Sequence, residues 1–316
     1  MLSYLAERAA WMALALFGVS VLTFGLGALA PGDPAEVVVE RRLNQSPPRE
    51  QVEEERRALG LDRPILQQYV RWLGRAVRGD LGRSWLRGIP VSDALRQRVP
   101  QTAALAAAAA CLSILVGVPL GVLSAGRRSS LADHLCRVGS LLGASIPSYF
   151  VAYLLVFTFS VSLRALPVFG FGTPAHLILP AVTLALGPTS TLVRLTRSSV
   201  LEALGEDYVR TARAMGRGRL GVLFGHALRN ALVPILTVIA LSLGHLLAGA
   251  IAVETVFAWP GLGDLTVTAI KDRDYPLIQG VVLLSGAAYV LVNFAVDVSY
   301  GWVDPRIRVE KRRARR

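Results

Sequence analysis

Residues Val99–Gly126 read VPQTAALAAAAACLSILVGVPLGVLSAG, a stretch of 28 residues without a single Asp, Glu, Lys or Arg. A helix of about 20 mainly apolar residues is long enough to cross the hydrocarbon core of a bilayer, which is about 30 Å thick. The apolar residues are continuous rather than alternating, which favours helices over the strands of a membrane barrel. Six such uncharged stretches occur: Ala9–Gly32, Val99–Gly126, Val138–Leu163, Ala165–Val193, Asn230–Val253 and Tyr275–Val296. The sequence therefore predicts an all-α integral membrane protein with six transmembrane helices.

The composition of the 316 residues agrees with a membrane protein and excludes several other classes. Hydrophobic residues make up 53% of the chain and charged residues only 18%, below the quarter or so that is usual for soluble domains. The formal net charge of +12 would suggest nucleic-acid binding in a soluble protein, but such an apolar chain argues against that partner. The basic residues are better explained by the bilayer itself, because their placement follows the spans.

Lysines, cysteines and histidines are too few or too scattered for the common catalytic and metal sites. The two lysines, Lys271 and Lys311, do not stand in a Gly-Lys-Ser/Thr phosphate loop, so the chain has no such ATP site of its own. The cysteines, Cys111 and Cys136, form no Cys-x-x-Cys pair, and no histidines occur at metal-ligand spacing. We expect no metal site, no bound cofactor and no enzyme, although an active site built from scattered residues is an alternative.

The placement of arginines predicts the orientation in the membrane. With six spans both termini lie on the same side, and the segments on that side carry 18 basic residues against three in the short loops opposite. Short cytoplasmic loops are enriched in Lys and Arg. Both termini are therefore expected in the cytoplasm, with Asp33–Arg98 outside. Three parts follow: residues 1–98, with the first span and the external segment; residues 99–301, with five spans; and the basic cytoplasmic tail, residues 302–316.

The external segment and the fourth apolar stretch contain further local signals. Helices are expected at Arg49–Leu59 and from Pro64 onward, where Ile65, Tyr69, Trp72 and Leu73 share one face. This segment is either a cap packed against the helix bundle or a docking surface for an external partner, and the two are compatible. In the fourth stretch, four prolines predict that residues 165–179 form an external loop with a short or re-entrant piece, and that the span runs from about Leu179 to Val193.

The loop between the fourth and fifth spans, Arg194–Arg229, carries the clearest functional signal. An apolar stripe at helical spacing consists of Leu201, Leu204, Tyr208, Ala212 and Met215. The opposite face is charged, with Glu206 four residues before Arg210. Gly216 and Gly218 break this pattern, and a second short helix is expected to turn inward its residues Leu220, Leu223, Phe224, Ala227 and Leu228, ending near Pro234. The loop is interpreted either as an amphipathic hairpin on anionic lipid or as a docking element for a cytoplasmic partner.

Two motifs in this loop carry a resemblance to a known family. Residues 206–216 read EDYVRTARAMG and residues 226–234 read HALRNALVP, which resembles the coupling loop of ABC importer permeases, in particular those of the dipeptide/oligopeptide/nickel permease family. Further stretches agree in order along the chain: LAPGDP (29–34), LGLDRP (59–64), GDLG (79–82), ETVFAWPGLG (254–263), RDYP (273–276) and DPRIR (304–308). The chain departs from the general Glu-Ala-Ala motif of such permeases by having Arg210-Thr-Ala212 and a delayed Pro234. The peptide branch commonly shows that variant.

The resemblance implies a type I ABC importer permease fold, a function and a set of partners. Such permeases pair with a second homologous permease and two cytoplasmic ABC ATPase subunits, which bind ATP and Mg, and they receive solute from an external solute-binding protein in the bacterial inner membrane. The permease forms the translocation path for di/oligopeptides or for nickel and other metal complexes, and the motifs do not distinguish these substrates. Coupling to the ATPase would fall on these residues: Glu206, Tyr208, Arg210, Thr211, Ala212, Gly216, His226 and Arg229.

Polar residues inside or at the ends of spans are candidates for the translocation path, because burying them in lipid is costly. His245 lies within the fifth span, where it either lines the path or hydrogen bonds to a neighbouring helix or to the partner permease. Asn293 lies near the end of the sixth span. Glu254 is expected at the outer mouth of the path, where the Trp259-Pro-Gly turn is a candidate gate or docking rim. The main alternative function is a self-contained secondary transporter of small polar solutes, although no half-repeat typical of that class is visible.

Overall fold

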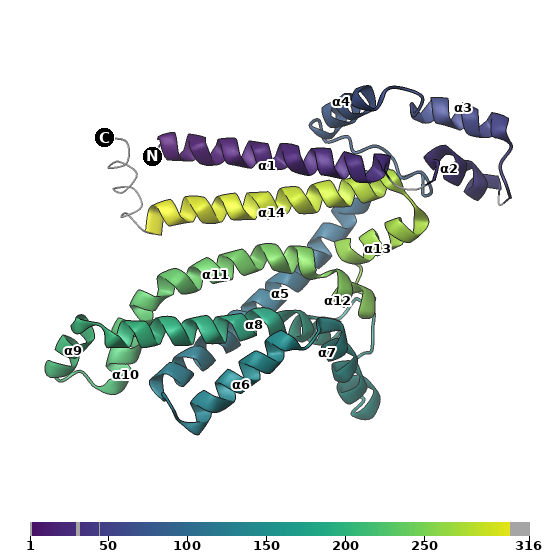
Figure 1. Ribbon diagram of the computed structural model, residues 1–316. Coiled ribbons are helices and arrows are strands. Elements are labelled where there is room, and N and C mark those ends of the chain that lie inside the picture. The colour runs from purple at the N-terminus through teal and green to yellow at the C-terminus, as the bar shows by residue number, and fades with distance from the viewer. Residues whose placement is uncertain (1, 30–31, 44, 304–316) are drawn as a thin grey trace. The chain divides into compact units, whose positions relative to one another are not determined.

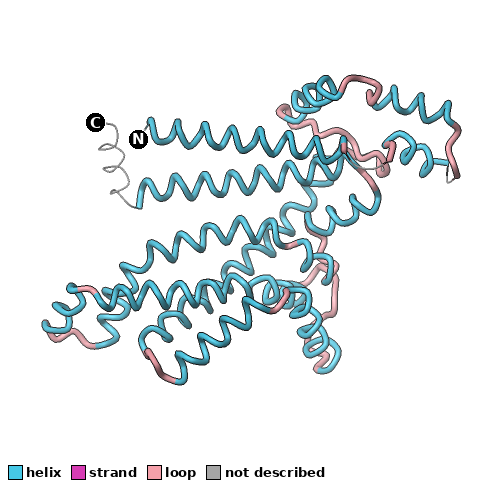
Figure 2. Tube along the Cα trace, viewed as in Figure 1, coloured by secondary structure: helices cyan, strands magenta, loops and turns pink. Residues whose placement is uncertain are grey.

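The computed structural model describes residues 2–29, 32–43 and 45–303, and all regular structure in these residues is helical (Figures 1 and 2). A single isolated bridge pairs Arg83 with Pro90. The longer helices are α1 (Leu2–Ala28), α5 (Val91–Gly126), α6 (Leu131–Ser145), α8 (Pro174–Gly205), α11 (Leu228–Gly249) and α14 (Tyr275–Val303). The shorter α-helices are α2 (Pro34–Leu43), α3 (Arg49–Leu59), α4 (Ile65–Ala76), α7 (Ser148–Leu155), α9 (Asp207–Ala214), α10 (Arg219–Val222), α12 (Ile251–Val256) and α13 (Leu262–Asp272). Two π-helical turns, η1 (Val156–Ser162) and η2 (Leu223–Ala227), continue α7 and α10.

Five described segments are long and apolar enough to cross a membrane, and a sixth is a bent pair. The five are Ala6–Ala28, Val91–Gly126, Pro174–Gly205, Arg219–Gly244 and Tyr275–Ala295. The third predicted span is not one continuous helix, because α6 and the helix formed by α7 and η1 meet at an angle of 105°. The break falls at Ile146, whose ψ of 127° is extended. A residue before a proline is disfavoured in the α conformation, and Pro147 follows here.

The fourth predicted span is longer at both ends than the prolines suggested. Helix α8 begins at Pro174 and continues through Pro180 and Pro188 to Gly205, so the expectation of a start near Leu179 is wrong. Prolines are tolerated within transmembrane helices where other groups compensate for the lost hydrogen bond. Pro188 offers no N–H to the carbonyl of Leu184, four residues before it. The hydroxyl groups of Ser113 and Thr189 donate to the next carbonyl, that of Ala185, at 3.1 and 2.7 Å.

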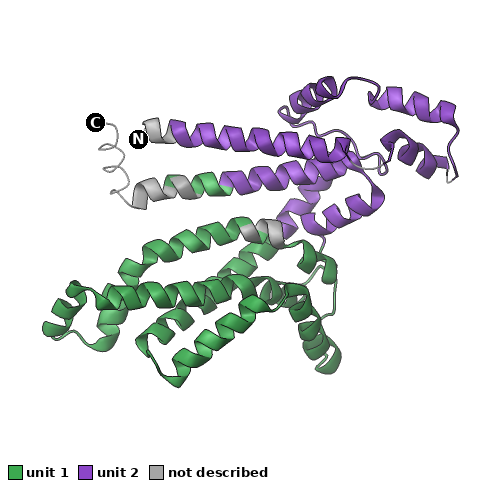
Figure 3. Ribbon diagram, in the orientation of Figure 1, with its two compact units in different colours: residues 1, 103–259, 292–316 green, residues 2–102, 260–291 purple. Residues whose placement is uncertain are grey.

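The described residues divide into two compact units, shown in Figure 3: residues 103–259 with 292–303 form unit 1, and residues 2–102 with 260–291 form unit 2. In unit 1, α5 packs closely against α8 through two glycines four residues apart. A Cβ on Gly121 would lie 2.6 Å from the Cβ of Thr196, and one on Gly117 would lie 2.8 Å from the Cβ of Leu192. Small residues at this spacing let the backbones of two membrane helices approach each other.

Unit 2 contains the external segment, and both helices predicted there are present. Helix α3 spans Arg49–Leu59 as expected, and α4 begins directly after Pro64. The rings of Tyr69 and Trp72 on α4 lie 5.4 and 5.8 Å from that of Phe24 on α1, so α4 packs against the first span. Ile65 is mostly exposed, which the shared-face prediction did not anticipate. Helices α2 and α13 were not predicted from the sequence.

The loop after α4 is held by a charge-assisted contact. The Nε of Arg75 donates to the carboxylate of Asp80 at 2.7 Å, and the backbone N–H of Gly82 donates to the other oxygen at 2.9 Å. These two hydrogen bonds, with that of Arg75 the larger cause, hold the pKa of the Asp80 carboxyl below its usual value.

Candidate functional site

The loop that carries the family-like motif forms a compact helical hairpin at one end of unit 1 (Figure 1). Helix α8 ends at Gly205, Glu206 is extended with a ψ of 151°, and α9 begins at Asp207. The predicted stripe from Leu201 to Met215 therefore does not lie on one helix, because the chain turns at Glu206. We call residues 207–222 the α9–α10 knob.

A small apolar core holds α9 and α10 together. Val209 and Ala212 of α9 and Val222 of α10 are almost completely buried, and Leu204 at the end of α8 packs against them. In the second short helix, Leu223 and Ala227 are buried as predicted, whereas Leu220 and Phe224 are exposed. Of the predicted apolar stripe, Ala212 is buried, but Tyr208 and Met215 are exposed. Ala212 thus faces inward as part of the predicted stripe, but Val209 takes the place of Tyr208, because α9 starts a new helical phase after Glu206.

Gly216 provides the turn between the two helices. Its φ is +80°, a conformation that glycine adopts far more readily than other residues. The turn is closed by hydrogen bonds from the N–H of Gly216 to the carbonyl of Arg213, at 3.0 Å, and from the N–H of Arg217 to that of Ala212, at 3.1 Å. Gly218 has a φ of −66°, so only the first of the two predicted glycine breaks needs a glycine conformation.

The outer surface of the α9–α10 knob combines apolar and basic side chains. Met215 and Leu220 are 72% and 70% exposed, and Tyr208 and Phe224 lie exposed in and just beyond the knob. Arg210, also exposed, pairs with Asp207 at 3.3 Å, rather than with Glu206 as its spacing suggested. Large exposed apolar side chains grouped with arginines are typical of protein interaction sites.

The remaining predicted coupling residues lie in or beside this hairpin. Thr211 is exposed on α9 and its hydroxyl donates to the carbonyl of Asp207 at 3.1 Å. His226 lies half-buried in η2, where its carbonyl accepts a hydrogen bond from the side chain of Asn230. Arg229 is exposed at the start of α11. Ala212, in contrast, is only 1% exposed and so stabilises the knob from inside rather than offering a contact surface.

The predicted outer gate residues are only partly brought together. Glu254 in α12 is completely buried, and its carbonyl accepts a hydrogen bond at 2.8 Å from the N–H of Trp259, itself 3% exposed. The indole ring packs edge-on against Phe171, with ring centroids 5.0 Å apart. Asn293 lies half-buried in α14 without a described side-chain hydrogen bond, and the side chain of His245, in α11, lies outside the described residues. Glu254 and Trp259 therefore form one tight turn, and nothing described joins Asn293 to it.

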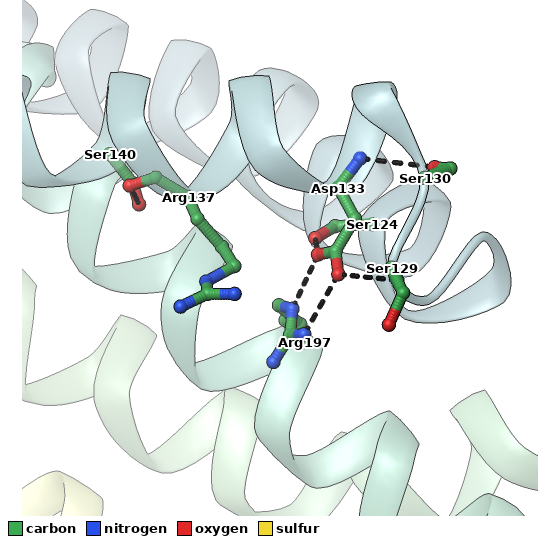
Figure 4. Close-up of polar contacts among 7 residues, drawn as sticks. All are labelled: Ser124, Ser129, Ser130, Asp133, Arg137, Ser140 and Arg197. Atoms are coloured by element: carbon green, nitrogen blue, oxygen red, sulfur yellow. Dashed lines mark hydrogen bonds and ion pairs between the residues drawn. The ribbon is translucent and has the colours of Figure 1, made fainter.

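A buried ion pair that was not predicted from the sequence joins α6 and α8, as shown in Figure 4. Arg197 donates to both carboxylate oxygens of Asp133, at 2.7 and 2.9 Å, and the Asp133 side chain is 1% exposed. The hydroxyl of Ser124 and the N–H of Ser129 donate to the same carboxylate, at 2.5 and 3.0 Å. The one signal in the sequence was Ser130 three residues before Asp133, a helix N-terminal spacing, and the hydroxyl of Ser130 indeed accepts from the N–H of Asp133.

Within the described part of the chain, no group of three or more His, Cys, Asp or Glu side chains could hold a metal ion. The candidate functional elements are thus the knob, the buried turn at Trp259 and the polar network between α6 and α8.

Comparison with protein-family models gives two matches that together cover most of the chain. A model described as the binding-protein-dependent transport system inner membrane component matches residues 117–309. A second, described as the N-terminal part of the membrane component of such transport systems, matches residues 1–106.

Similar curated proteins extend over nearly the whole length. The di/tripeptide transport system permease protein DppB of Pseudomonas aeruginosa (strain UCBPP-PA14) is 41% identical, covering 98% of this chain and 100% of the relative. The dipeptide transport system permease protein DppB of Escherichia coli (strain K12) is 40% identical with the same coverage. Among solved structures, an inward-facing conformation of the MetNI methionine ABC transporter aligns with a TM-score of 0.57 at 21% identity, over 66% of this chain and 96% of that chain. This last likeness concerns the fold alone.

Proposed function

Because the chain belongs to the family of binding-protein-dependent transport system inner membrane components, we propose that it is the permease subunit of an ATP-driven importer of di- or oligopeptides. Its fold is that of an ABC importer permease. The substrate class rests on the relatives named for dipeptide and di/tripeptide transport, which favour peptides over nickel complexes. The chain supplies the path and the mechanical coupling, and ATP with Mg is bound by separate ATPase subunits.

The α9–α10 knob is the observation that carries the coupling part of this proposal. The buried contacts of Val209, Ala212 and Val222 make it a rigid body, and the exposed Met215 and Leu220 give it an apolar tip. A rigid knob inserted into a groove of an ATPase subunit follows the movement of that subunit. Helix α8 leads directly into the knob, so closure of the ATPases would tilt the spans and open the path to one side.

The remaining partners follow from the same assignment. A second homologous permease completes the path, and an external solute-binding protein delivers the peptide to the side that carries α2, α3 and α4. In this arrangement the knob and both termini face the cytoplasm of a bacterial cell. Trp259 and Glu254 then lie toward the external mouth of the path, whereas His245 and Asn293 stay predicted path residues.

The test is a pull-down of the chain from native membranes in gentle detergent, with partners identified by mass spectrometry, followed by uptake of a labelled dipeptide. We expect stoichiometric recovery of a second permease and two ATPase subunits, and uptake that stops when ATP is depleted. Recovery of a lone chain or a homo-oligomer whose uptake follows an ion gradient would instead support the secondary transporter.

A further inference from the structure

Four basic side chains line one groove between α6 and α8, away from the knob and from the predicted path residues. His134 and Arg137 are three residues apart on α6, and Arg194 and Arg197 are three residues apart on α8, so each pair shares a helix face. The two helices pack side by side. The groove between them has a volume of about 520 Å³, and its other lining residues include Val138 and Leu141.

The positive charge of this groove is only partly balanced. Asp133 pairs with Arg197 through two of the five N–H donors of the guanidinium group, which fixes this side chain in place. Within the described part of the chain, the guanidinium groups of Arg137 and Arg194 have neither a hydrogen bond nor an acidic partner. Figure 4 shows that Arg137 extends from α6 into the same space that Arg197 approaches from α8. Several guanidinium groups converging on one space fit an anion that accepts hydrogen bonds from more than one of them.

The groove opens onto an apolar helix face that is not covered by other described elements. Leu135, Val138, Leu141 and Leu142 on α6 are all more than half exposed. The groove also lies near the end of the spans on the side of the knob. Only four residues separate the end of α5 from the start of α6, and Arg219 of α10 donates to the carbonyl of Gly126 at that end. A charged pocket at the end of a span, continued along the span by an apolar face, matches the two parts of a phospholipid.

We propose that this groove binds one phospholipid with an anionic headgroup, such as phosphatidylglycerol, with its phosphate on Arg137, Arg194 and Arg197 and an acyl chain along Leu135, Val138 and Leu142. Basic pockets between transmembrane helices on the cytoplasmic side bind anionic headgroups in this way. A free phosphate would use the arginines but not the apolar face. The inference rests on the proposed function only in assigning the groove to the cytoplasmic leaflet, because the groove is a different surface from the knob and the path.

The experiment measures lipid retention by the assembled complex, purified in gentle detergent, with native mass spectrometry. The probes are dioleoyl-phosphatidylglycerol, dioleoyl-phosphatidylcholine and inorganic phosphate. The variants are Arg137→Gln and Arg194→Gln, alone and together, and both positions are exposed, so folding should be unaffected. Arg128→Gln is the matched control, because Arg128 is an exposed arginine in the loop before α6 but does not line the groove.

We expect wild type to retain phosphatidylglycerol in preference to phosphatidylcholine. Each groove substitution should weaken that retention by about tenfold, since one charge-assisted hydrogen bond is worth roughly a factor of ten in binding. The control should bind like wild type, and millimolar phosphate should not displace the lipid. The proposal would be overturned if the double variant retained phosphatidylglycerol as well as wild type does. It would also be overturned if Arg128→Gln lost as much retention as the groove variants, or if phosphate displaced the lipid. Lipid retention by the isolated chain but not by the assembled complex would also overturn the proposal, because another subunit would then fill the groove in the complex. None of these outcomes depends on whether the complex transports peptides.

Discussion

Substitution of Gly216 tests whether the shape of the knob, rather than its chemistry, couples it to the ATPase. A Cβ at this position would meet nothing within 4 Å, so alanine causes no clash. The cost comes from the φ of +80°, which is disfavoured by about 1–2 kcal/mol for a residue with a Cβ. That penalty shifts the balance between the native turn and a distorted one by about five- to thirtyfold. Asparagine tolerates this conformation better than alanine, and a β-branched residue tolerates it least.

The assay is uptake of a labelled dipeptide by cells that carry the variant as the sole copy, normalised to the amount of chain in the membrane. We expect uptake to decrease in the order wild type, Gly216→Asn, Gly216→Ala, Gly216→Val, with normal insertion throughout. Gly218→Ala is the control, because Gly218 has an ordinary φ of −66° and equally open surroundings. Wild-type uptake by Gly216→Val, or an equal loss in Gly218→Ala, would refute the argument from backbone conformation.

Three further predictions concern stability, read as the thermal or denaturant midpoint of the purified chain in detergent. Asp133→Ala should lower the free energy of unfolding by about 3–5 kcal/mol, because it leaves the guanidinium group of Arg197 unpaired. Adding Arg197→Met should restore much of that stability. A double variant that is no more stable than the single variant would contradict this prediction. Gly121→Ala should lower the free energy of unfolding by about 1–3 kcal/mol, because the added Cβ forces α5 away from α8. Gly187→Ala should lower it far less, because a Cβ there would meet nothing within 4 Å. Similar unfolding midpoints for the two variants would contradict close packing of α5 and α8. The pKa of the Asp80 carboxyl is lower in the folded chain than its usual value of about 3.9, so the ionised carboxyl stabilises the fold. For an exposed pair this stabilisation is less than about 1 kcal/mol. It should be present above about pH 3.9 and be lost as the pH falls from there through the lowered pKa. Asp80→Asn should therefore differ from wild type at pH 6 but not at pH 2, and a difference that persists at pH 2 would exclude this origin.

The sequence predicted the spans well where a single physical signal determined them. Long uncharged stretches located α1, α5, α11 and α14 to within a few residues at most ends, because the hydrocarbon core requires that many apolar residues. Prolines misled the prediction in both directions. Pro147 breaks the third span, where the sequence analysis expected continuity, whereas Pro180 and Pro188 lie inside α8. Around Pro180 the helix is held by packing of Leu179, Ala181, Leu184 and Ala185 in the core of unit 1, and such packing is a tertiary property.

The candidate site was predicted in position but not in detail. The glycine turn at residue 216 and the presence of two short helices were anticipated. The buried side chains were anticipated only in part: Ala212, Leu223 and Ala227 are buried as the pattern suggested. Val209 was not expected, because the extended residue Glu206 resets the helical phase and buries it in place of Tyr208. The pair of Asp133 and Arg197 joins residues 64 positions apart, and no local pattern reveals a contact of that separation.

The length of α8 has a consequence for how the protein can change over evolution. This one helix of 32 residues carries the Arg197 side of the buried ion pair and leads directly into the knob. Inserting or deleting one residue in an α-helix rotates everything beyond it by about 100° and moves it by about 1.5 Å along the axis. A single-residue insertion between Arg197 and Gly205 would thus leave the ion pair in place and point the knob in a different direction. We expect this stretch to tolerate substitutions but not insertions or deletions, so that the number of residues between Arg197 and Gly205 stays constant among related permeases.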